Sequence, residues 1–385
     1  MTTTPVHLLH SSPLIGGGNT VLLRLIDGLD RQRFEPMSIV PDEGPLARAL
    51  AARGVPACRL DLARAIGLAR LARLGRFSIY LRRHGRALVH ANDPHTYGMS
   101  RPCLSPRSSR WICHVHHPDA DTRTLTWAFR LAPVRVLTPS RYVATLVERS
   151  LPDRLAAVRD RIRTVMNPID TAFFSPTRER DALMSRLDCR PGALHLVTAG
   201  AITPHKGQDL FVRVVKTLRD RGLDVEGHVI GGIQPGQEQY DASVHALTAE
   251  LGLTSHVRFH GFASNEDVRD WFRIAEVFLL PTSEEGFGLV LAEAQACGTP
   301  VVSTRIPPLD EVVLHERTGL LVPRTVDEMA EAAERLLRAP GQRRAMGDAG
   351  RAWVVSAFAA NTFCDRVMSV YDEALAPQTS GTERR

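Results

Sequence analysis

Residues 281–300 read PTSEEGFGLVLAEAQACGTP, and this stretch indicates the fold class of the chain. It continues the apolar run VFLLP (277–281), whose length and composition predict a buried strand. Gly286 and Gly288 form a turn in which backbone amides can approach a ligand, because glycine has no side chain in the way. LVLAEAQAC then predicts a helix that ends at Gly298 in the left-handed conformation. A strand, a glycine turn and a helix in this order form one unit of a parallel α/β sheet.

The same alternation of short apolar runs and helical patterns repeats along the chain in two series. We therefore predict an α/β protein with two Rossmann-like domains, each a parallel sheet covered by helices on both faces. The predicted strands are 6–10, 36–40, 87–91, 110–116, 134–139 and 162–167 in the first series, and 194–200, 225–231, 257–261, 277–281 and 299–304 in the second.

The domain boundaries are predicted from a pause in this alternation between 168 and 193, where prolines and charges indicate a linker. Residues 1–172 are assigned to the N-terminal domain and residues 173–344 to the C-terminal domain. A final helix at 345–374 is expected to pack back on the first domain. Residues 375–385 are expected to form a disordered tail.

Composition argues against several other classes of protein. The 385 residues include 44% hydrophobic and 23% charged residues, which is typical of a soluble globular protein. The net charge of +6 comes from scattered basic residues, so a nucleic-acid-binding tail is not indicated. Six widely separated cysteines without a C-x-x-C pair argue against a zinc ribbon or a disulfide framework and favour a reducing compartment. A signal-peptide pattern and a long apolar run are both missing, which favours a cytoplasmic location.

One stretch, 59–86, is basic and roughly amphipathic. It predicts either a peripheral contact with an anionic membrane or a helix that packs on its sheet with solvated arginines.

Two glycine turns follow predicted strands, and ligands of parallel α/β sheets bind at such strand ends. Gly16, Gly17 and Gly18 follow the first strand without the G-x-G-x-x-G spacing of a dinucleotide site, so they form either a phosphate-binding turn or a plain turn. Lys206 lies in VTAGAITPHKGQDLF (197–211), which lacks the spacing of a Walker A loop. Its charge either faces a diphosphate or is solvated at the surface.

Histidines gather at the end of the predicted strand 110–116, as His114 and His116 and then His117. Strand alternation places His114 and His116 on one face, so a metal site is one interpretation. However, Pro118 stands where the H-x-H-x-D-H pattern of a metallo-β-lactamase needs an aspartate, and later strand ends offer no clear set of further ligands. The other interpretation is a single imidazole that donates a hydrogen bond to a ligand, and His116 is the better candidate because it lies closer to the strand end.

Two acids, Glu285 and Glu293, lie eight positions apart in the opening stretch, one in the turn and one on the helix. Carboxylates repel phosphates, so we expect both to accept hydrogen bonds from hydroxyl groups, one on a hexose and one on a ribose. Solvated surface acids are the alternative. For Glu293 the neighbouring Ala292, Ala294 and Ala296 argue against it, because small residues imply close packing.

These motifs resemble the signature of the retaining GT-B glycosyltransferases of family GT4. The E-x7-E block EEGFGLVLAEAQACGTPVV carries most of the resemblance. The glycine turn at 16–18, HVHHP, VLTPSRYVATLV, VMNPIDTAFFSP, GAITPHKG and RTGLLVP fall in the family's order, so the resemblance covers nearly the whole chain. It implies two Rossmann-like domains that face each other across a cleft, with the acceptor site in the N-terminal domain and the nucleotide-sugar site in the C-terminal domain.

The resemblance also implies an activity and the residues that perform it. A hexose or N-acetylhexosamine is transferred with retention from a nucleotide diphosphate sugar, expected to be a UDP-sugar, to an acceptor hydroxyl; no metal or other cofactor is expected. Lys206 binds the diphosphate, Glu285 the sugar, Glu293 the ribose, and His116 contacts the sugar near the reacting centre. The implied donor-binding residues are Gly16, Gly17, Gly18, Lys206, Glu285, Gly286, Phe287, Gly288, Leu289 and Glu293, and the implied catalytic residues are His116, Lys206 and Glu285.

Two positions depart from the family's pattern. Ala201 stands where the family usually has arginine, which removes one charge-assisted phosphate contact, so either another arginine substitutes or the donor binds more weakly. Pro307 and Pro308 stand where a Gly-Gly pair is usual, which alters the loop that admits the acceptor.

Two other functions share parts of the pattern. The missing G-x-G-x-x-G disfavours an NAD-dependent oxidoreductase. A non-catalytic nucleotide-sugar-binding protein would keep the same pocket and differ only in activity. The expected acceptor is a small molecule, a lipid or a glycan, and no nucleic-acid partner is expected.

Overall fold

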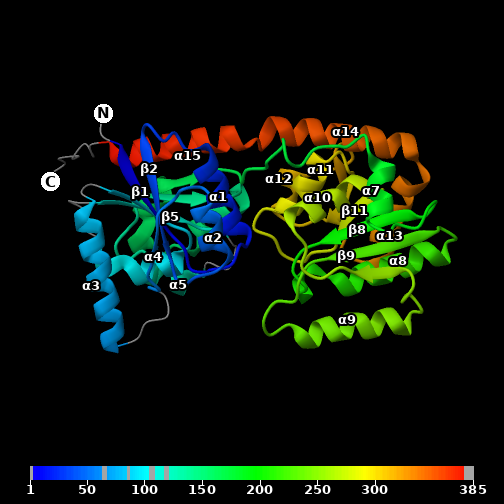
Figure 1. The fold of residues 1–385 in the computed structure, drawn as a ribbon, viewed down its shortest axis with the longest axis horizontal. Coiled ribbons are helices and arrows are strands. Elements are labelled where there is room, and N and C mark those ends of the chain that lie inside the picture. The colour runs from blue at the N-terminus through cyan, green and yellow to red at the C-terminus, as the bar shows by residue number, and fades with distance from the viewer. Residues whose placement is uncertain (1–2, 63–66, 85–86, 104–108, 117–120, 377–385) are drawn as a thin grey trace. The chain divides into compact units, whose positions relative to one another are not determined.

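The computed structural model describes residues 3–62, 67–84, 87–103, 109–116 and 121–376. The chain divides into two compact units, each with its own parallel sheet (Figure 1). Unit 1 comprises Met1–Pro168 and Ala360–Arg385, and unit 2 comprises Ile169–Ala359. The prediction of an α/β protein with two Rossmann-like domains is therefore confirmed. The expected tail at 375–385 lies almost entirely outside the described residues.

Unit 1 is a seven-stranded sheet in the order β3-β2-β1-β4-β5-β6-β7, and every pair of neighbouring strands is parallel. The order reverses between β1 and β4, so the strand ends there form a topological switch point, where ligands of such sheets bind. Its elements are β1 Thr4–Leu9, α1 Gly17–Gly28, β2 Phe34–Val40, α2 Pro45–Ala51, β3 Ala57–Arg59, α3 Gly67–Arg83, β4 Ala87–Ala91, α4 Pro94–Ser100, η1 Arg101–Cys103, β5 Ser109–His114, α5 Thr122–Ala128, β6 Arg135–Thr138, α6 Arg141–Ser150, η2 Asp153–Arg161, β7 Ile162–Thr164 and α15 Ala360–Leu375.

Unit 2 is a six-stranded parallel sheet in the order β10-β9-β8-β11-β12-β13, and its switch point lies between β8 and β11. Its strands are almost wholly buried, as expected for a parallel sheet with helices on both faces. Its elements are α7 Arg180–Arg186, β8 Leu194–Ala199, η3 Pro204–Lys206, α8 Gln208–Asp220, β9 Val225–Ile230, α9 Glu238–Glu250, β10 Val257–Phe259, α10 Asn265–Ile274, β11 Val277–Leu280, α11 Leu289–Ala296, β12 Val301–Thr304, α12 Leu309–Val312, β13 Gly319–Val322, α13 Val326–Arg338 and α14 Pro340–Ala357.

The prediction of a single helix at 345–374 is wrong. The structure has two helices, α14 and α15, and the first of them ends just before Phe358. Phe358 is 2% exposed, and its ring packs edge-on against Phe287 and Trp353 of unit 2. The chain leaves the helical conformation at this residue. Consequently α14 belongs to unit 2 and only α15 belongs to unit 1.

The boundary between the units lies between Pro168 and Ile169, a few residues before the predicted position at 172. The Ile169 N–H donates to the Phe358 carbonyl (2.8 Å), so the chain is already tied to unit 2 at this point. The predicted linker also contains helix α7, which packs on α10.

Helix α15 completes the core of unit 1 although it comes last in the chain. Cys364 packs on α1 at Gly28, where an added Cβ would lie only 2.5 Å from its sulfur. The Tyr371 hydroxyl shares a hydrogen bond of 2.8 Å with Nδ1 of His90 in β4, and its ring meets Phe34 of β2 edge-on. The first sheet therefore depends on a helix that is encoded after unit 2.

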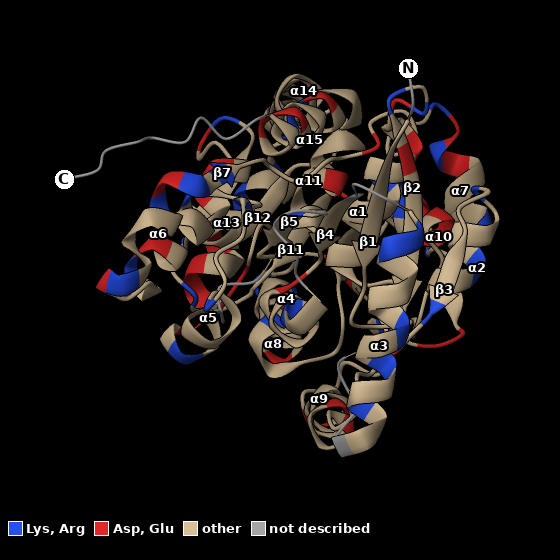
Figure 2. Cartoon of the chain, turned by 90° about the vertical axis from the view of Figure 1, so that its left-hand side faces the viewer, with Lys and Arg blue, Asp and Glu red and all other residues tan. Residues whose placement is uncertain are grey.

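Within the basic stretch 59–86 the structure has helix α3, which carries arginines along its length (Figure 2). Its Leu74, Phe77 and Leu81 lie in the core of unit 1, whereas Leu68 and Leu71 are exposed. The helix therefore packs on its unit by one face, and a peripheral membrane contact through the other stays a prediction. In the described ranges, none of the helices combines the length and the apolar character needed to cross a bilayer.

Candidate functional site

The predicted donor-binding residues of unit 2 meet at the switch point between β8 and β11. Lys206 ends the short helix η3 after β8, and Glu285 lies in the loop after β11. The two residues are 79 positions apart in sequence, but the Lys206 ammonium donates to Glu285 Oε1 at 2.5 Å. Their side chains are only 18% and 10% exposed, so water screens the pair little. An ammonium has two further N–H donors, which leaves Lys206 able to bind an anion as well.

Left-handed glycines hold the two loops of this site in contact. Gly207 follows Lys206 with φ 73°, and a Cβ there would collide with the Pro281 carbonyl oxygen. The Ser283 N–H and the Thr282 hydroxyl both donate to the His205 carbonyl, at 2.7 and 3.0 Å. The turn after β11 is therefore fastened by its backbone to the turn after β8.

Gly288 begins helix α11 in the left-handed conformation, with φ 94°. A Cβ on Gly288 would lie 2.8 Å from Leu309, which follows the cis peptide bond between Pro307 and Pro308. The unusual proline pair thus leads directly into a residue that packs under the glycine turn.

Phe287 anchors this turn from below. Its ring is 3% exposed and packs against Phe358, so its side chain belongs to the core. The buried Gly286 precedes it, and Leu289 begins α11. The first amides of a helix have no partner within the helix, and the first turn of α11 contains no acidic side chain. This helix end is suited to an anion.

Glu293 lies on α11, one turn after Leu289 and on the same face of the helix. Its side chain is half-buried, and Ala292, Ala294 and Ala296 are fully buried. The close packing inferred from these alanines is confirmed.

Arg324 is one residue of this group that the motifs did not reveal. It follows β13, its Nε donates to the Pro281 carbonyl at 2.8 Å, and its Nη2 would lie 2.9 Å from a Cβ on Gly207. Its signal in the sequence is its place shortly after the apolar run GLLV (319–322). It is an arginine that the fold brings beside the loop where Ala201 replaces the usual arginine.

The glycine turn and His116 meet at the switch point of unit 1. Gly16 caps α1 and Gly17 begins it, while a Cβ on Gly18 would lie 3.0 Å from the His116 ring. His116 Nε2 lies 2.6 Å from the Asn92 side-chain oxygen. Asn92, directly after β4, was not among the predicted residues, although it stands at a strand end as His116 does.

Hydrogen bonding fixes the protonation of His116. Asn19 donates through Nδ2 to the Ser12 and Leu14 carbonyls, at 3.2 and 2.7 Å, so its Oδ1 accepts. That oxygen receives Asn92 Nδ2 at 3.0 Å, which turns the Asn92 oxygen toward His116 as an acceptor. His116 therefore carries its hydrogen on Nε2. Burial lowers the pKa of His116 to about 4, so the ring is neutral near pH 7 and Nδ1 keeps a lone pair.

His114, the other strand-end histidine, lies behind His116 in the core. The two rings stack at 3.8 Å, and His114 Nδ1 lies 3.3 Å from His90 Nε2. Burial and the two neighbouring histidines lower the pKa of His114 well below its usual value. Neither histidine belongs to a potential three-ligand metal cluster within the described residues, and His117 and Pro118 lie outside them. The choice between a metal site and a single site imidazole stays a prediction.

Family models match both units of the chain. The model of the glycosyl transferases group 1 matches residues 180–353, and the model of Glycosyltransferase Family 4 matches residues 15–173. The D-inositol 3-phosphate glycosyltransferase of Arthrobacter sp. (strain FB24) is 35% identical over 195 residues, which are 50% of this chain and 45% of that protein. The chain thus spans about half the length of the curated relatives that it matches.

Solved structures with the same fold include Anabaena Alr3699/HepE. Its complex with UDP has a TM-score of 0.84 and 18% identity, and the match covers 96% of this chain and 100% of that chain. Its complex with UDP-glucose has a TM-score of 0.84 and covers 96% and 99%. At this identity the likeness shows the fold alone. Together with the family models it shows that the chain belongs to glycosyltransferase family 4, the family of the group 1 glycosyl transferases with the GT-B fold.

Proposed function

We propose that this chain is a retaining glycosyltransferase that moves a hexose, or an N-acetylhexosamine, from a UDP-sugar to an acceptor hydroxyl. The observation that carries the proposal is the Lys206–Glu285 pair at the β8/β11 switch point, beside the N-terminus of α11. A cation and a helix N-terminus attract a diphosphate, and a carboxylate beside them accepts sugar hydroxyls. The UDP and UDP-glucose complexes of HepE support the donor class.

The acceptor is proposed to carry ring hydroxyls. The relatives named D-inositol 3-phosphate glycosyltransferase support a small polyol, and the net charge of +6 agrees with an acceptor that is itself anionic.

Bond cleavage in this proposal relies on electrostatic stabilisation. As the sugar–oxygen bond breaks, negative charge grows on the leaving diphosphate, where the Lys206 ammonium and the α11 amides are already in place to meet it. Glu285 remains a hydrogen-bond acceptor for the sugar and also orients Lys206. The acceptor hydroxyl attacks from the face that the diphosphate leaves and passes its proton to an oxygen of the departing diphosphate, which gives retention without a covalent sugar–enzyme intermediate.

His116 is proposed to contact the sugar near the reacting centre as a neutral ring, because burial lowers its pKa to about 4. Asn92 holds the hydrogen on Nε2, and Nδ1 is buried without a hydrogen-bond partner among the described residues. The role expected from the sequence, a donor of a hydrogen bond to the ligand, stays a prediction.

Glu293 gives the direct test of the proposed donor site. UDP, GDP and dTDP sugars are titrated calorimetrically into the wild type and Glu293→Ala. Of the three donor classes, we expect a UDP-sugar to bind the wild type best. The variant should bind it about 10- to 100-fold more weakly, because it loses hydrogen bonds to a charged acceptor. Glu250→Ala, an exposed acid at the end of α9, is the matched control. If the wild type, Glu293→Ala and Glu250→Ala bind the donor equally well, the proposed donor site is wrong. If the donor binds but no sugar is transferred to any polyol acceptor, the proposed activity is wrong.

Asn92→Asp tests the protonation state of His116. A carboxylate at this position is expected to raise the pKa of His116 from about 4 by about 1–3 units, because a nearby negative charge stabilises the imidazolium. The acidic limb of the kcat/KM profile then moves to higher pH, since the ring is protonated up to a higher pH. Asn92→Ala removes the hydrogen bond without adding charge and leaves that limb in place. Superimposable pH profiles for Asn92→Asp and the wild type would refute this role for Asn92.

A further inference from the structure

A buried group of metal-ligating side chains lies in unit 2 apart from the donor site. It consists of Cys189, in the connection from α7 to β8, His195 in β8 and His228 in β9. One potential ligand atom of each residue lies within 4.8 Å of those of the other two. Both histidines are 0% exposed and Cys189 is 8% exposed. His195 lies shortly after Cys189, and His228 follows 33 positions after His195. The group contains a single cysteine, so cysteine spacing gave no sign of it.

The spacing of the two imidazoles suits a metal ion. His195 Nδ1 and His228 Nε2 lie 3.0 Å apart. Two nitrogens on a tetrahedral zinc ion, each about 2.0–2.1 Å from it, are separated by roughly 3.3 Å. Small ring movements are therefore enough to direct both lone pairs at one ion.

His260 supplies the outer partner that metal-bound histidines need. Its Nε2 lies 3.2 Å from Nδ1 of His228. When His228 binds through Nε2, its Nδ1–H donates to His260, and such a partner fixes the tautomer and the ring orientation of a ligand.

Glu226 offers a fourth ligand, a carboxylate oxygen. It is 2% exposed, and Arg190 Nε holds its Oε1 at 2.9 Å. Its Oε2 has no hydrogen-bond partner among the described residues and lies 3.9 Å from His195 Nδ1. A buried carboxylate oxygen without a partner is costly, and a cation beside it removes that cost.

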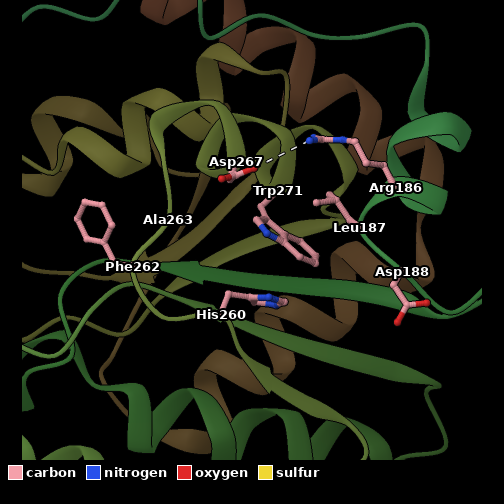
Figure 3. A pocket seen from close by; sticks show the side chains of 8 residues that line it. All are labelled: Arg186, Leu187, Asp188, His260, Phe262, Ala263, Asp267 and Trp271. Carbon is pink, nitrogen blue, oxygen red and sulfur yellow. Dashed lines mark ion pairs between the residues drawn. The ribbon is translucent and has the colours of Figure 1, made fainter.

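A pocket lies beside this group. It has a volume of about 290 Å³ and is lined by residues of α7, of α10 and of the loop between β10 and α10 (Figure 3). His260 and Trp271 form part of its wall, with ring centroids 4.3 Å apart, and Leu187 and Asp188 line it just before Cys189. The pocket therefore gives an ion a path as far as His260, the neighbour of His228.

We propose that Cys189, His195 and His228 bind one divalent transition-metal ion, with Glu226 or water as the fourth ligand, and that zinc is the best match. A thiolate with two imidazoles selects zinc and its neighbours over magnesium or calcium, which prefer oxygen ligands. The ion displaces the proton of the Cys189 thiol to solvent as the sulfur–metal bond forms. His195 lies near the start of β8, whereas Lys206 follows its end, so the ion ties the α7–β8 connection to the sheet and does not take part in sugar transfer.

Cobalt(II) titration of the full chain tests the proposal. After treatment with a chelator, the wild type should bind one equivalent of Co²⁺ with a sulfur-to-cobalt charge-transfer band, and Zn²⁺ should abolish the band and raise the Tm. Cys189→Ser should lose the band, and His228→Gln should bind Zn²⁺ more than about 100-fold more weakly, since even outer partners of metal ligands change affinity 10- to 100-fold.

Matched controls are Cys58→Ser and His245→Gln, whose side chains lie outside the group and which should bind as the wild type does. A wild type without the charge-transfer band overturns the proposal, and this measurement needs no variant to fold. A band that persists in Cys189→Ser also overturns it. Sugar transfer plays no part in these measurements, so they are independent of the proposed function.

Discussion

Replacing Lys206 with alanine is expected to lower kcat for sugar transfer by about 10²- to 10³-fold, the usual effect of removing one preorganised donor to a developing oxyanion. The ammonium stabilises charge that appears on the diphosphate as the sugar departs, so the effect falls on turnover more than on donor affinity. The substitution also removes the cation that pairs with Glu285, whose residue is only 8% exposed. The Glu285 carboxylate then lies beside the negative charge of a bound diphosphate. Steady-state kinetics and donor titration on the same preparations separate the two quantities.

A second variant separates charge from packing. Lys206→Met keeps most of the aliphatic stem, which lies 3.7–3.9 Å from a Cβ position on Gly200, and removes the ammonium. It should lose as much turnover as the alanine variant. Lys216→Ala, which breaks an exposed pair with Asp220 on α8, should be indistinguishable from the wild type. If Lys206→Met keeps wild-type kcat, the ammonium does not act on the leaving group.

Gly207→Ala is expected to weaken both the fold of unit 2 and its donor site. An L-residue at φ 73° costs about 1–2 kcal/mol, and the new Cβ would also collide with the Pro281 carbonyl and lie 2.9 Å from Arg324 Nη2. A backbone carbonyl cannot rotate away as a side chain can, so the turn that holds Lys206 must move away from the turn that holds Glu285. Donor affinity should fall at least tenfold, and the free energy of unfolding should fall by more than the conformational cost alone.

Gly222→Ala isolates the conformational cost. Gly222 has φ 80° after α8, and a Cβ there meets nothing within 4 Å. It should lose only about 1–2 kcal/mol and keep wild-type donor affinity. Urea unfolding and donor titration of both variants give the comparison. Equal losses of stability and affinity in the two variants would mean that contact between the turns is unimportant.

The parts of this molecule that local sequence determines were predictable. The strand at 277–281, the glycine turn and the helix up to Gly298 are all present, because apolar length, glycine conformation and helix capping act over a few residues. The same holds for most predicted strands. The strands β3 and β13 were missed.

The features that depend on partners distant in the chain were not predictable. The E-x7-E spacing gave Glu285 a role toward a sugar, but no pattern showed that Lys206, 79 positions earlier, would bind it. Asn92 fixes the hydrogen on His116 only because Asn19 orients it in turn. Each of these contacts follows from the strand order of a sheet, which local periodicity does not encode.

The position of α15 bears on how the protein is made. A ribosome delivers residues 169–359 as one uninterrupted stretch before α15, so all of unit 2 is synthesised before that helix. The first sheet emerges earlier but lacks Cys364 and Tyr371, whose places against α1 and His90 are filled only by the last helix. Unit 1 is therefore completed only after unit 2 has been synthesised. Until then, the apolar side chains of unit 1 that α15 covers remain uncovered.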